Sequence, residues 1–415
     1  MKILVLNAGS SSQKSALYDF QDFQPFHQLL QPLWSAEITW NLGTEAAELR
    51  VETFCGTEYS VQFPNNDRQS GMRQMLETLW SEPTQVIGNA SEIDAVGHRV
   101  VHGGTIKSAA LRIDAQVKAT IASLIPLAPS HNPINLEGIE LIETVLGADV
   151  QQFAVFDTAF HSQIPDAAAI YPGPYDWVDL GIRRYGFHGI SHAYCSDRIL
   201  QLLGHEKLGH EKLGHEAFKL ITCHLGNGCS LAAIRDGISI DTTMGFTPLE
   251  GLMMGSRSGS VDPGILLYLM TERGYDATTL EVLLNQQSGL KGLSGISHDV
   301  RRVKEAMKAG NLRAKLAWDV YVHRIRSGIG AMLMSLNGLN ALVFTAGVGE
   351  HDSAMRSAVC HGLGFLGVSI DEAINQEGTG DRDIATQDSL VRVWVLQTQE
   401  DWHIAKSCWT ATKLE

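Results

Sequence analysis

Residues 1–20 read MKILVLNAGSSSQKSALYDF, and this stretch decides the fold class. The apolar run KILVL (2–6) predicts a buried strand, and SALYDF (15–20) predicts a second strand that returns beside it. The polar stretch NAGSSSQK (7–14) joins them, so we expect a hairpin with a polar tip. This tip has the small residues, hydroxyls and lysine of a phosphate-binding loop, but it does not match GxxxxGK[ST]. It is therefore either a phosphate-binding hairpin or an ordinary polar turn.

A second hairpin is expected at LITCHLGNGCSLAAIRDGISIDTT (220–243). Its apolar runs are separated by a Gly-Asn-Gly turn at 226–228 and followed by an Asp-Gly turn at 236–237, both of which favour hairpins. Because similar hairpins begin near residues 1 and 220, we expect two related halves.

Other segments alternate between strands and helices. The apolar runs of FAVFDTAFH (153–161) and ALVFTAGVGEH (341–351) predict strands that end in loops. Residues 312–336, LRAKLAWDVYVHRIRSGIGAMLMSL, have apolar residues at three- and four-residue spacing, which predicts a helix. Strands that end in glycine-rich or acidic loops, mixed with helices, are typical of an α/β protein whose ligand binds at the strand ends.

Composition narrows the class of protein. A chain of 415 residues is too long for one ordinary core, so we expect two domains. The net charge of -14 argues against a nucleic acid partner. The sequence has no apolar run typical of a membrane span or a secretory signal, and its six cysteines are scattered without a CxxC pair. We therefore expect a reduced, cytoplasmic protein with no membrane partner.

A tandem repeat, LGHEKLGHEKLGHE (203–216), brings three histidines into H-x4-H spacing. A step of five residues turns about 140° on a helix and changes face on a strand, so the three imidazoles do not converge on one metal ion. We expect a solvated surface segment. The alternative is a histidine-rich metal-binding segment.

Two arginines lie among small residues. Arg99 is in HRVVHGG (98–104), and Arg257 is in GLMMGSRSGSVDPG (251–264). An arginine beside glycine and serine can contact a phosphoryl group while backbone amides approach it, as phosphoryl transfer requires. Taken alone, an arginine in such a setting is more often a surface or structural ion-pair residue than a phosphoryl ligand.

Five further motifs accompany these arginines. FDTAFH, GIRRYGFHG, GNG, MGFTPLEGLMMG and FTAGVGE follow one another from residue 156 to residue 350. Together with VLNAGSSSQK, HRVVHGG, LAPSHNP and the near-terminal TQED, they closely resemble the acetokinase family. The resemblance extends over essentially the whole chain and does not depend on one short pattern.

This resemblance implies a fold, a domain division and an activity. The family belongs to the superfamily of acetate and sugar kinases, actin and heat-shock chaperones, which implies an α/β fold of two duplicated actin-like (ribonuclease H-like) domains around a nucleotide cleft. The expected domains are residues 1–157 with 397–415, and residues 158–396, which carry the nucleotide pocket. Members transfer the terminal phosphoryl group of ATP reversibly to acetate with Mg²⁺, or with Mn²⁺ as an alternative. The reaction gives acetyl phosphate and ADP by direct in-line attack, and members are usually homodimers.

The resemblance also assigns roles to individual residues. The metal ligands fall on Asn7 and Glu400, and the catalytic residues are Arg99, Asp157, His188 and Arg257. The contacts to nucleotide and phosphates are Ser10, Ser12, Lys14, Asn227, Gly228, Asp299, Arg301, Gly347 and Gly349. The carboxylate pocket is formed by Arg99, Val101, Ser130, Phe187 and Pro248.

Elementary chemistry agrees with these roles. A carboxylate with a pKa of about 4 is already ionised at neutral pH, so the nucleophile needs no general base. It does need relief from repulsion by the phosphates, which two arginines, a metal and an imidazole can supply. We therefore interpret His188 as a hydrogen-bond or charge partner of the phosphoryl group. The alternatives are a core histidine packed by Tyr185 and Phe187, a helix N-cap for Asp157 and an ordinary exposed side chain for Glu400.

Three departures from the family pattern leave alternatives open. Ser130 stands where the family usually has leucine. Each lost methylene contact alters discrimination by about 1 to 3 kcal/mol, so the preference between acetate and propionate could shift without loss of the reaction. The terminal TNEE of the family is TQED here, and the 203–216 repeat is an insertion outside every motif. The alternatives are therefore a propionate or other short-chain carboxylate kinase and, in another class, an actin- or chaperone-like ATPase.

Overall fold

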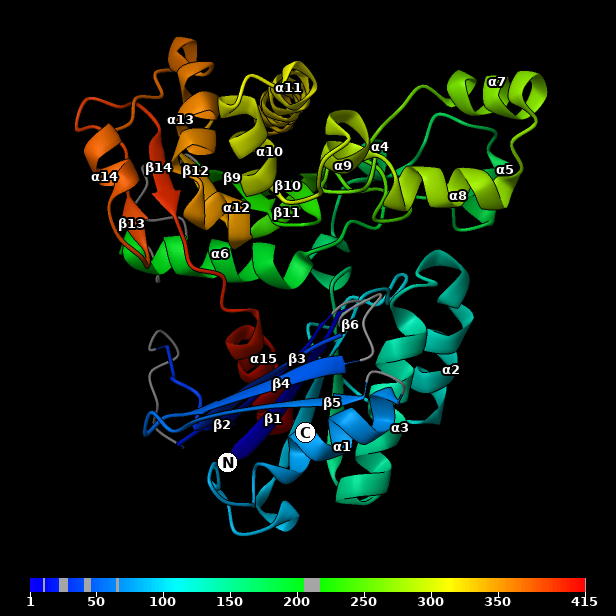
Figure 1. Ribbon diagram of the computed structural model, residues 1–415, viewed down its shortest axis with the longest axis vertical. Coiled ribbons are helices and arrows are strands. Elements are labelled where there is room, and N and C mark those ends of the chain that lie inside the picture. Colours follow the sequence, from blue (N-terminus) through cyan, green and yellow to red (C-terminus); the bar gives the residue numbers. More distant parts are fainter. Residues whose placement is uncertain (10–11, 22–28, 41–45, 65–66, 205–216, 415) are drawn as a thin grey trace. The chain divides into compact units, whose positions relative to one another are not determined.

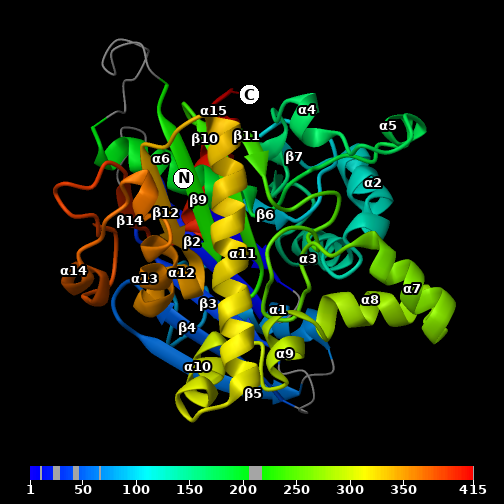
Figure 2. The ribbon, with the colours of Figure 1, turned by 90° about the horizontal axis from the view of Figure 1, so that it is seen from above.

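The structure is a computed structural model whose chain forms two compact units. Unit 1 comprises Met1–Phe160 with Gln399–Glu415, and unit 2 comprises His161–Thr398 (Figures 1 and 2). The residues that the structure describes are 1–9, 12–21, 29–40, 46–64, 67–204 and 217–414.

Unit 1 is built on an eight-stranded sheet in the order β5-β4-β3-β2-β1-β6-β8-β7. Strands β1, β6 and β8 are parallel, whereas β2 to β5 extend the sheet as an antiparallel meander. The strands are β1 (Lys2–Ala8), β2 (Ser12–Asp19), β3 (Trp34–Thr39), β4 (Ala46–Thr53), β5 (Glu58–Pro64), β6 (Ala95–Val100), β7 (Leu111–Arg112) and β8 (Gln151–Phe156).

Helices cover both faces of this sheet. Val96 of β6 packs in one apolar cluster with residues of α1 (Arg68–Glu77) and α3 (Asn132–Leu146), and α2 (Ala115–Ser123) packs against α3. On the other face, a Cβ atom at Gly97 would lie 2.7 Å from the sulfur of Cys408, which belongs to α15 (Glu400–Leu414). The last helix of the chain therefore packs on the sheet that the first residues begin.

The first hairpin differs from its predicted form. β1 and β2 pair antiparallel, as expected, but the pairing extends to Asn7 opposite Lys14 and Ala8 opposite Gln13. The prediction of a polar turn over 7–14 is therefore wrong in extent, because alternation along β2 buries Gln13 and exposes Lys14. Ser10 lies outside the described residues.

Unit 2 contains a six-stranded sheet in the order β11-β10-β9-β12-β14-β13. The second hairpin forms as predicted, and Asp236 and Gly237 both adopt positive φ (51° and 81°), as a two-residue hairpin turn requires. The strands are β9 (Lys219–Leu225), β10 (Cys229–Arg235), β11 (Ile238–Thr242), β12 (Ala341–Thr345), β13 (Arg382–Asp383) and β14 (Arg392–Val395).

The longest helix of unit 2, α11 (Leu312–Leu336), has the bounds that the apolar spacing predicts (Figure 2). A Cβ atom at Gly328 of α11 would lie 2.8 Å from Leu231 of β10, whereas His192 of α6 (Gly189–Leu202) bonds to the neighbouring Ser230. The two helices therefore cover opposite faces of this sheet. The remaining helices are α4 (Asp166–Ala169), α5 (Asp176–Asp179), α7 (Pro263–Arg273), α8 (Ala277–Gln286), α9 (Gly289–Ser294), α10 (Val300–Lys308), α12 (Ala346–His351), α13 (Ser353–His361) and α14 (Glu372–Gln376).

One expected loop in unit 2 is a helix. ALVFTAGVGEH was predicted to run from a strand into a loop, but β12 passes directly into α12. Ala346 makes the sharp change of direction with φ of 64°, and its N–H donates to Thr398 Oγ1 at 3.0 Å. That bond satisfies one of the exposed N–H groups at the start of α12.

The two sheets share one topology, which confirms the prediction of related halves. In unit 1 the order β3-β2-β1-β6-β8 has a hairpin on one side of β1 and two parallel strands on the other. In unit 2 the order β11-β10-β9-β12-β14 repeats this arrangement around β9. Within the described residues, none of the helices is long and apolar enough to span a membrane.

Candidate active site

Polar side chains gather in unit 1 where three parallel strands end. Asn7 lies near the end of β1, Arg99 near the end of β6, and Asp157 directly after β8. The Arg99 guanidinium donates to Asp157 Oδ2 from Nη2 at 2.6 Å and from Nε at 3.1 Å, and Nη1 donates to Asn7 Oδ1 at 3.4 Å. Because the carboxyl ends of parallel strands meet at one edge of a sheet, residues distant in sequence come together here.

The first turn of α15 adds two carboxylates to this group. Asn7 Nδ2 donates to Asp401 Oδ1 at 2.8 Å and to Glu400 Oε2 at 3.3 Å. Glu400 is therefore half-buried and held in place, unlike the exposed residue that its sequence context favours. Asp401, which the sequence analysis did not select, belongs to the same group, and the only sequence signal for it is the acidic pair in TQED.

Electrostatics couples these residues. Burial lowers the pKa of Arg99, but the charges of Asp157, Glu400 and Asp401 oppose burial and raise the pKa overall. Burial also raises the pKa of the Asp401 carboxyl, the hydrogen bond from Asn7 opposes this, and the charge of Glu400 adds to it. The guanidinium thus stays charged between carboxylates that repel one another, an arrangement that a bound cation would relieve.

The donor set near Asn7 fits Mg²⁺. No group of three or more His, Cys, Asp or Glu side chains in the described part of the chain is arranged to hold a metal ion. Mg²⁺, however, commonly takes only one or two carboxylates and completes its shell with waters and substrate phosphates. Glu400 and Asp401, with the amide of Asn7 beside them, supply that minimal oxygen set.

Asp157 is better explained by its ion pair than by helix capping. Its N–H donates to Val100 O at 3.0 Å, which continues the pairing of β6 and β8 by one residue. Its side chain is then 2% exposed and faces Arg99, whose side chain is 16% exposed. Asp157 is followed by Thr158 and then by a short 3-10 turn, Ala159–His161.

A second group forms in unit 2 around Gly228. A Cβ atom at Gly228 would lie 3.1 Å from His188 Nε2 and 3.6 Å from Arg257 Nη1, so the two side chains converge on this glycine. Arg257 Nη1 also donates to Pro248 O at 3.0 Å, and Gly255 N–H donates to Asn227 O at 3.1 Å. His188, Asn227, Gly228, Pro248 and Arg257 therefore form one polar group at the tip of the β9-β10 hairpin.

His188 does not sit in an apolar core. Its backbone is left-handed, with φ of 56°, directly before α6, and its ring stacks on His224 with centroids 4.1 Å apart. Its Nδ1 lies 2.8 Å from Ser230 Oγ. Left-handed backbone at a non-glycine residue costs about 1 kcal/mol or more and often marks a functional position.

The predicted nucleotide contacts lie on separate elements of unit 2. Asp299 caps α10 and receives hydrogen bonds from Arg301, whose side chain is 85% exposed and accessible to a ligand. Gly347 lies in α12 with open space at its Cβ position. A Cβ atom at Gly349 would lie 3.3 Å from the backbone of Phe344, so this glycine permits close packing of α12 on β12.

The residues predicted to form the carboxylate pocket belong partly to unit 1 and partly to unit 2. In unit 1, Val101 is buried after β6 and Ser130 is exposed before α3. In unit 2, Phe187 is buried and Pro248 is half-buried beside Arg257. His192, His224 and Ser230, which lie around His188, were not predicted as site residues from the sequence. The H-x3-H spacing in GFHGISH was a usable signal for His192.

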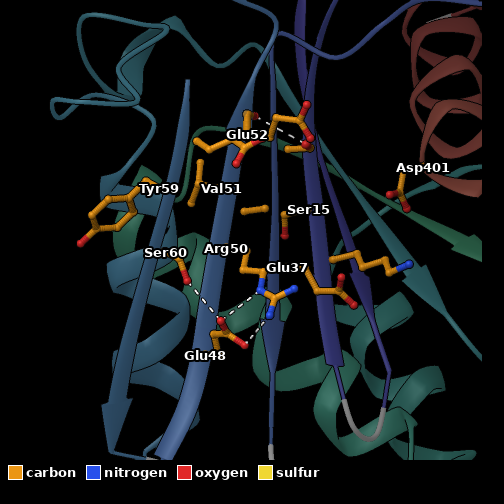
Figure 3. Close-up of a pocket in the computed structure, with 13 residues that line it drawn as sticks. Ser15, Glu37, Glu48, Arg50, Val51, Glu52, Tyr59, Ser60 and Asp401 are labelled. Atoms are coloured by element: carbon orange, nitrogen blue, oxygen red, sulfur yellow. Dashed lines mark hydrogen bonds and ion pairs between the residues drawn. The ribbon is translucent and has the colours of Figure 1, made fainter. Parts of the chain in front are cut away.

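Ser12 and Lys14 lie at the start of β2. Lys14 lines an open hollow on the sheet of unit 1 together with Asp401 and side chains of β3, β4 and β5 (Figure 3). Four glutamates, Glu37, Glu48, Glu52 and Glu58, line the same hollow, and Glu48 is paired with Arg50. An acidic surface disfavours phosphate groups, so the hollow itself is a poor candidate for the nucleotide pocket.

Comparison with known proteins identifies the family. A model of the acetokinase family matches residues 2–406. The chain is 58% identical to an acetate kinase of Nostoc punctiforme, with 100% of both chains covered. It resembles the crystal structures of an acetate kinase from Porphyromonas gingivalis (39% identity, TM-score 0.86, 100% of both chains) and a propionate kinase from Francisella tularensis subsp. tularensis SCHU S4 (35% identity, TM-score 0.86, 98% of both chains). The duplicated actin-like fold, the polar groups and these matches together mean that the chain belongs to the acetokinase family.

Proposed function

We propose that the chain is an acetate kinase that transfers the terminal phosphoryl group of ATP to acetate and runs the reaction in both directions. In the forward direction a carboxylate oxygen attacks the terminal phosphorus, the bond from phosphorus to the bridging oxygen breaks, and acetyl phosphate and ADP form. The observation that carries this proposal is the polar group of unit 1. In it, Asn7, Arg99 and Asp157 at the strand ends meet Glu400 of α15, in a chain of the acetokinase family.

The arginines and the histidine act on charge. Two unit charges 4 Å apart repel by about 1 kcal/mol in water and about 4 kcal/mol at an effective dielectric of 20, so acetate needs cations to approach ATP. Arg99 and Arg257 supply two fixed positive charges, and His188 donates a hydrogen bond to the phosphoryl group. No general base is required, because acetate is already ionised.

Asn7, Glu400 and Asp401 would hold Mg²⁺. When bound, Mg²⁺ neutralises charge on the phosphates of the nucleotide and helps to hold them in line. Asp157 orients Arg99 through the two hydrogen bonds to its guanidinium.

The nucleotide is proposed to bind mainly to unit 2. Arg301, Gly347 and Asn227 would contact it there, with Asp299 orienting Arg301. Ser12 and Lys14 of unit 1 would contact the phosphates. We also propose a cytoplasmic location, which five buried cysteines of six and the use of ATP support.

A hydroxylamine assay tests the activity directly. Hydroxylamine traps acyl phosphates, so a hydroxamate is expected from acetate, ATP and Mg²⁺, and none without acetate. ATP turnover that is independent of any carboxylate, with no hydroxamate, would instead indicate an actin- or chaperone-like ATPase.

A propionate kinase is the second candidate, because a solved relative bears that name and Ser130 departs from the family pattern. Comparison of kcat/KM for acetate, propionate and butyrate decides between them. Ser130→Leu should change the ratio of kcat/KM for acetate to that for propionate by up to about 200-fold. This corresponds to at most about 3 kcal/mol.

We also propose that the chain forms a homodimer through helix α7. None of the residues of α7 is buried, and Ile265, Leu267, Tyr268 and Met270 are 44% to 65% exposed, which is unusual for so apolar a helix. Light scattering should give twice the chain mass. Leu267→Glu should yield monomers, whereas a wild-type chain that is monomeric at micromolar concentration would contradict the proposal.

A further inference from the structure

Hydrogen bonds link His188 to a buried histidine that the proposed mechanism does not use. Ser230 Oγ lies 2.8 Å from His188 Nδ1 and 2.8 Å from His192 Nε2. The other nitrogen of His192, Nδ1, lies 2.6 Å from Thr222 Oγ1. Thr222, His192 and Ser230 are fully buried, so a continuous chain of hydrogen bonds leads from the interior of unit 2 to His188.

His192 must be neutral in this chain. Burial, followed by the neighbouring His161 and His224, lowers the pKa of His192 well below its ordinary value. A neutral imidazole has one N–H donor and one bare acceptor nitrogen. Its two hydroxyl neighbours must therefore play opposite roles, one as acceptor and one as donor.

Thr222 fixes which role each hydroxyl plays. In the described part of the chain, Thr222 Oγ1 has His192 Nδ1 as its one hydrogen-bond partner. If Nδ1 carried the proton, the Thr222 hydroxyl hydrogen would be buried without an acceptor, which is costly. Thr222 therefore donates to Nδ1, and the proton of His192 is on Nε2.

The donor and acceptor roles at His192 determine which nitrogen of His188 carries the proton. His192 Nε2–H donates to Ser230 Oγ, so the single hydroxyl hydrogen of Ser230 is available for His188 Nδ1. A nitrogen that accepts a hydrogen bond is bare, so the proton of neutral His188 is on Nε2. That nitrogen lies nearest Gly228, on the side that Arg257 also approaches.

We propose that Thr222, His192 and Ser230 are positioning residues that hold His188 in the tautomer with its proton on Nε2. The role of this tautomer rests on the proposed function: Nε2 of a neutral His188 presents a hydrogen-bond donor to the phosphoryl group. No positive charge on His188 is then needed beside Arg257. No proton is transferred along the chain.

A second pair of residues holds the backbone of His188. His161 Nε2–H donates to the Phe187 carbonyl at 3.2 Å, so His161 Nδ1, 2.8 Å from Ser239 Oγ, accepts from that hydroxyl. The peptide before His188 is thereby fixed while the left-handed φ of His188 itself is under strain. Ring and backbone are each held by a buried histidine.

A matched pair at Thr222 separates the hydroxyl from packing. Thr222→Val keeps the shape of the side chain and removes the hydroxyl donor. His192 can then carry its proton on either nitrogen, so the hydrogen bonds to Ser230 and His188 can run in either direction. Thr222→Ser keeps the donor and removes a methyl group.

The tautomer of His188 is measured by NMR in full-length protein labelled with ¹⁵N-histidine, and His188→Asn serves to assign the signals. Wild type and Thr222→Ser should have His188 protonated on Nε2. Thr222→Val should populate the Nδ1 form. In the assay, Thr222→Val should lower kcat about two- to tenfold with both KM values within about twofold.

Ser239→Ala is the control, because it removes a buried hydroxyl from His161 and should leave the tautomer of His188 unchanged. The proposal is overturned if wild-type His188 carries its proton on Nδ1, or if Thr222→Val and Thr222→Ser behave alike. Should Thr222→Val fail to fold, Ser230→Ala replaces it with the same expected change at His188. The tautomer is measured without turnover, so a chain that made no acyl phosphate would overturn the proposed function and leave this inference standing.

Discussion

Arg99 and Asp157 form a largely buried ion pair in unit 1, with Arg99 Nη2 2.6 Å from Asp157 Oδ2. Loss of either partner alone leaves an uncompensated charge in the interior, which typically destabilises a protein by about 3 to 5 kcal/mol. Substitution of Arg99 therefore affects folding and catalysis together, and the two effects have to be separated.

We expect Arg99→Ala to lower kcat by about 10³ and to lower the free energy of unfolding as well. The double variant Arg99→Ala with Asp157→Asn should recover much of the stability, because the orphaned carboxylate is gone, but none of the activity. Urea unfolding and the hydroxylamine assay measure the two quantities. Full activity in a stably folded double variant would remove Arg99 from the mechanism.

Arg257→Ala should also lower kcat by about 10³. The side chain of Arg257 is half-buried and donates to the backbone carbonyl of Pro248. Arg313→Ala is a matched control: Arg313 is an exposed arginine of unit 2 that likewise donates to backbone carbonyls, those of Gly292 and Leu293. It should keep near-normal kcat. Equal activity of the two variants would contradict the role of Arg257.

Asn7→Ala should raise the Mg²⁺ concentration required for half-maximal activity. The amide of Asn7 donates to both Glu400 and Asp401, so its loss frees the two carboxylates to move apart. Titration of activity with Mg²⁺ at saturating ATP and acetate measures the effect. A variant with an unchanged Mg²⁺ requirement would show that Asn7 takes no part in the metal site.

Stability should fall in mild acid partly because of His98. Burial lowers the pKa of His98 to about 4, despite the opposing effect of its hydrogen bond to Gln152. The unfolded chain binds a proton at this residue below about pH 6.5, whereas the folded chain does so only below about pH 4. The contribution of His98 to the free energy of unfolding is therefore fully present at neutral pH. It decreases as the pH falls through this window, by about 2 kcal/mol at pH 5.

The variant His98→Gln tests this pH dependence. Between pH 7 and pH 5, urea unfolding of the wild type should lose about 2 kcal/mol more than unfolding of the variant. The other buried histidines contribute equally to both proteins, so they cancel in the comparison. Parallel losses in the two proteins would assign the acid sensitivity to other residues.

Helices and strands that are specified by short stretches of neighbouring residues were predicted correctly from the sequence. The Gly-Asn-Gly and Asp-Gly turns defined the second hairpin, and the apolar spacing defined both ends of α11. The ends of β1 and β2 and the helix after β12 were wrongly predicted, because they depend on register with a partner strand and on the bond from Ala346 to Thr398.

The candidate site shows the same division. Family motifs selected Arg99, Asp157 and His188, whereas the contacts of Asp401 and Ser230 with these groups form only when the chain has folded. Asp401 meets Asn7 across 394 positions of sequence, and the hydroxyl of Ser230 lies 42 positions from His188. No local pattern records such contacts.

The return of α15 to the sheet that β1 begins has a consequence for biosynthesis. Residues 399–415 complete unit 1, yet they leave the ribosome after every residue of unit 2. Until then the face of β6 at Gly97 lacks Ile404 and Cys408, and Asn7 lacks both of its carboxylate partners. A domain usually folds as a unit once it has been synthesised. The sheet of unit 1 can therefore be completed only after α15 has been synthesised. A nascent chain that stops short of residue 400 therefore lacks the two carboxylates of the site that contact Asn7.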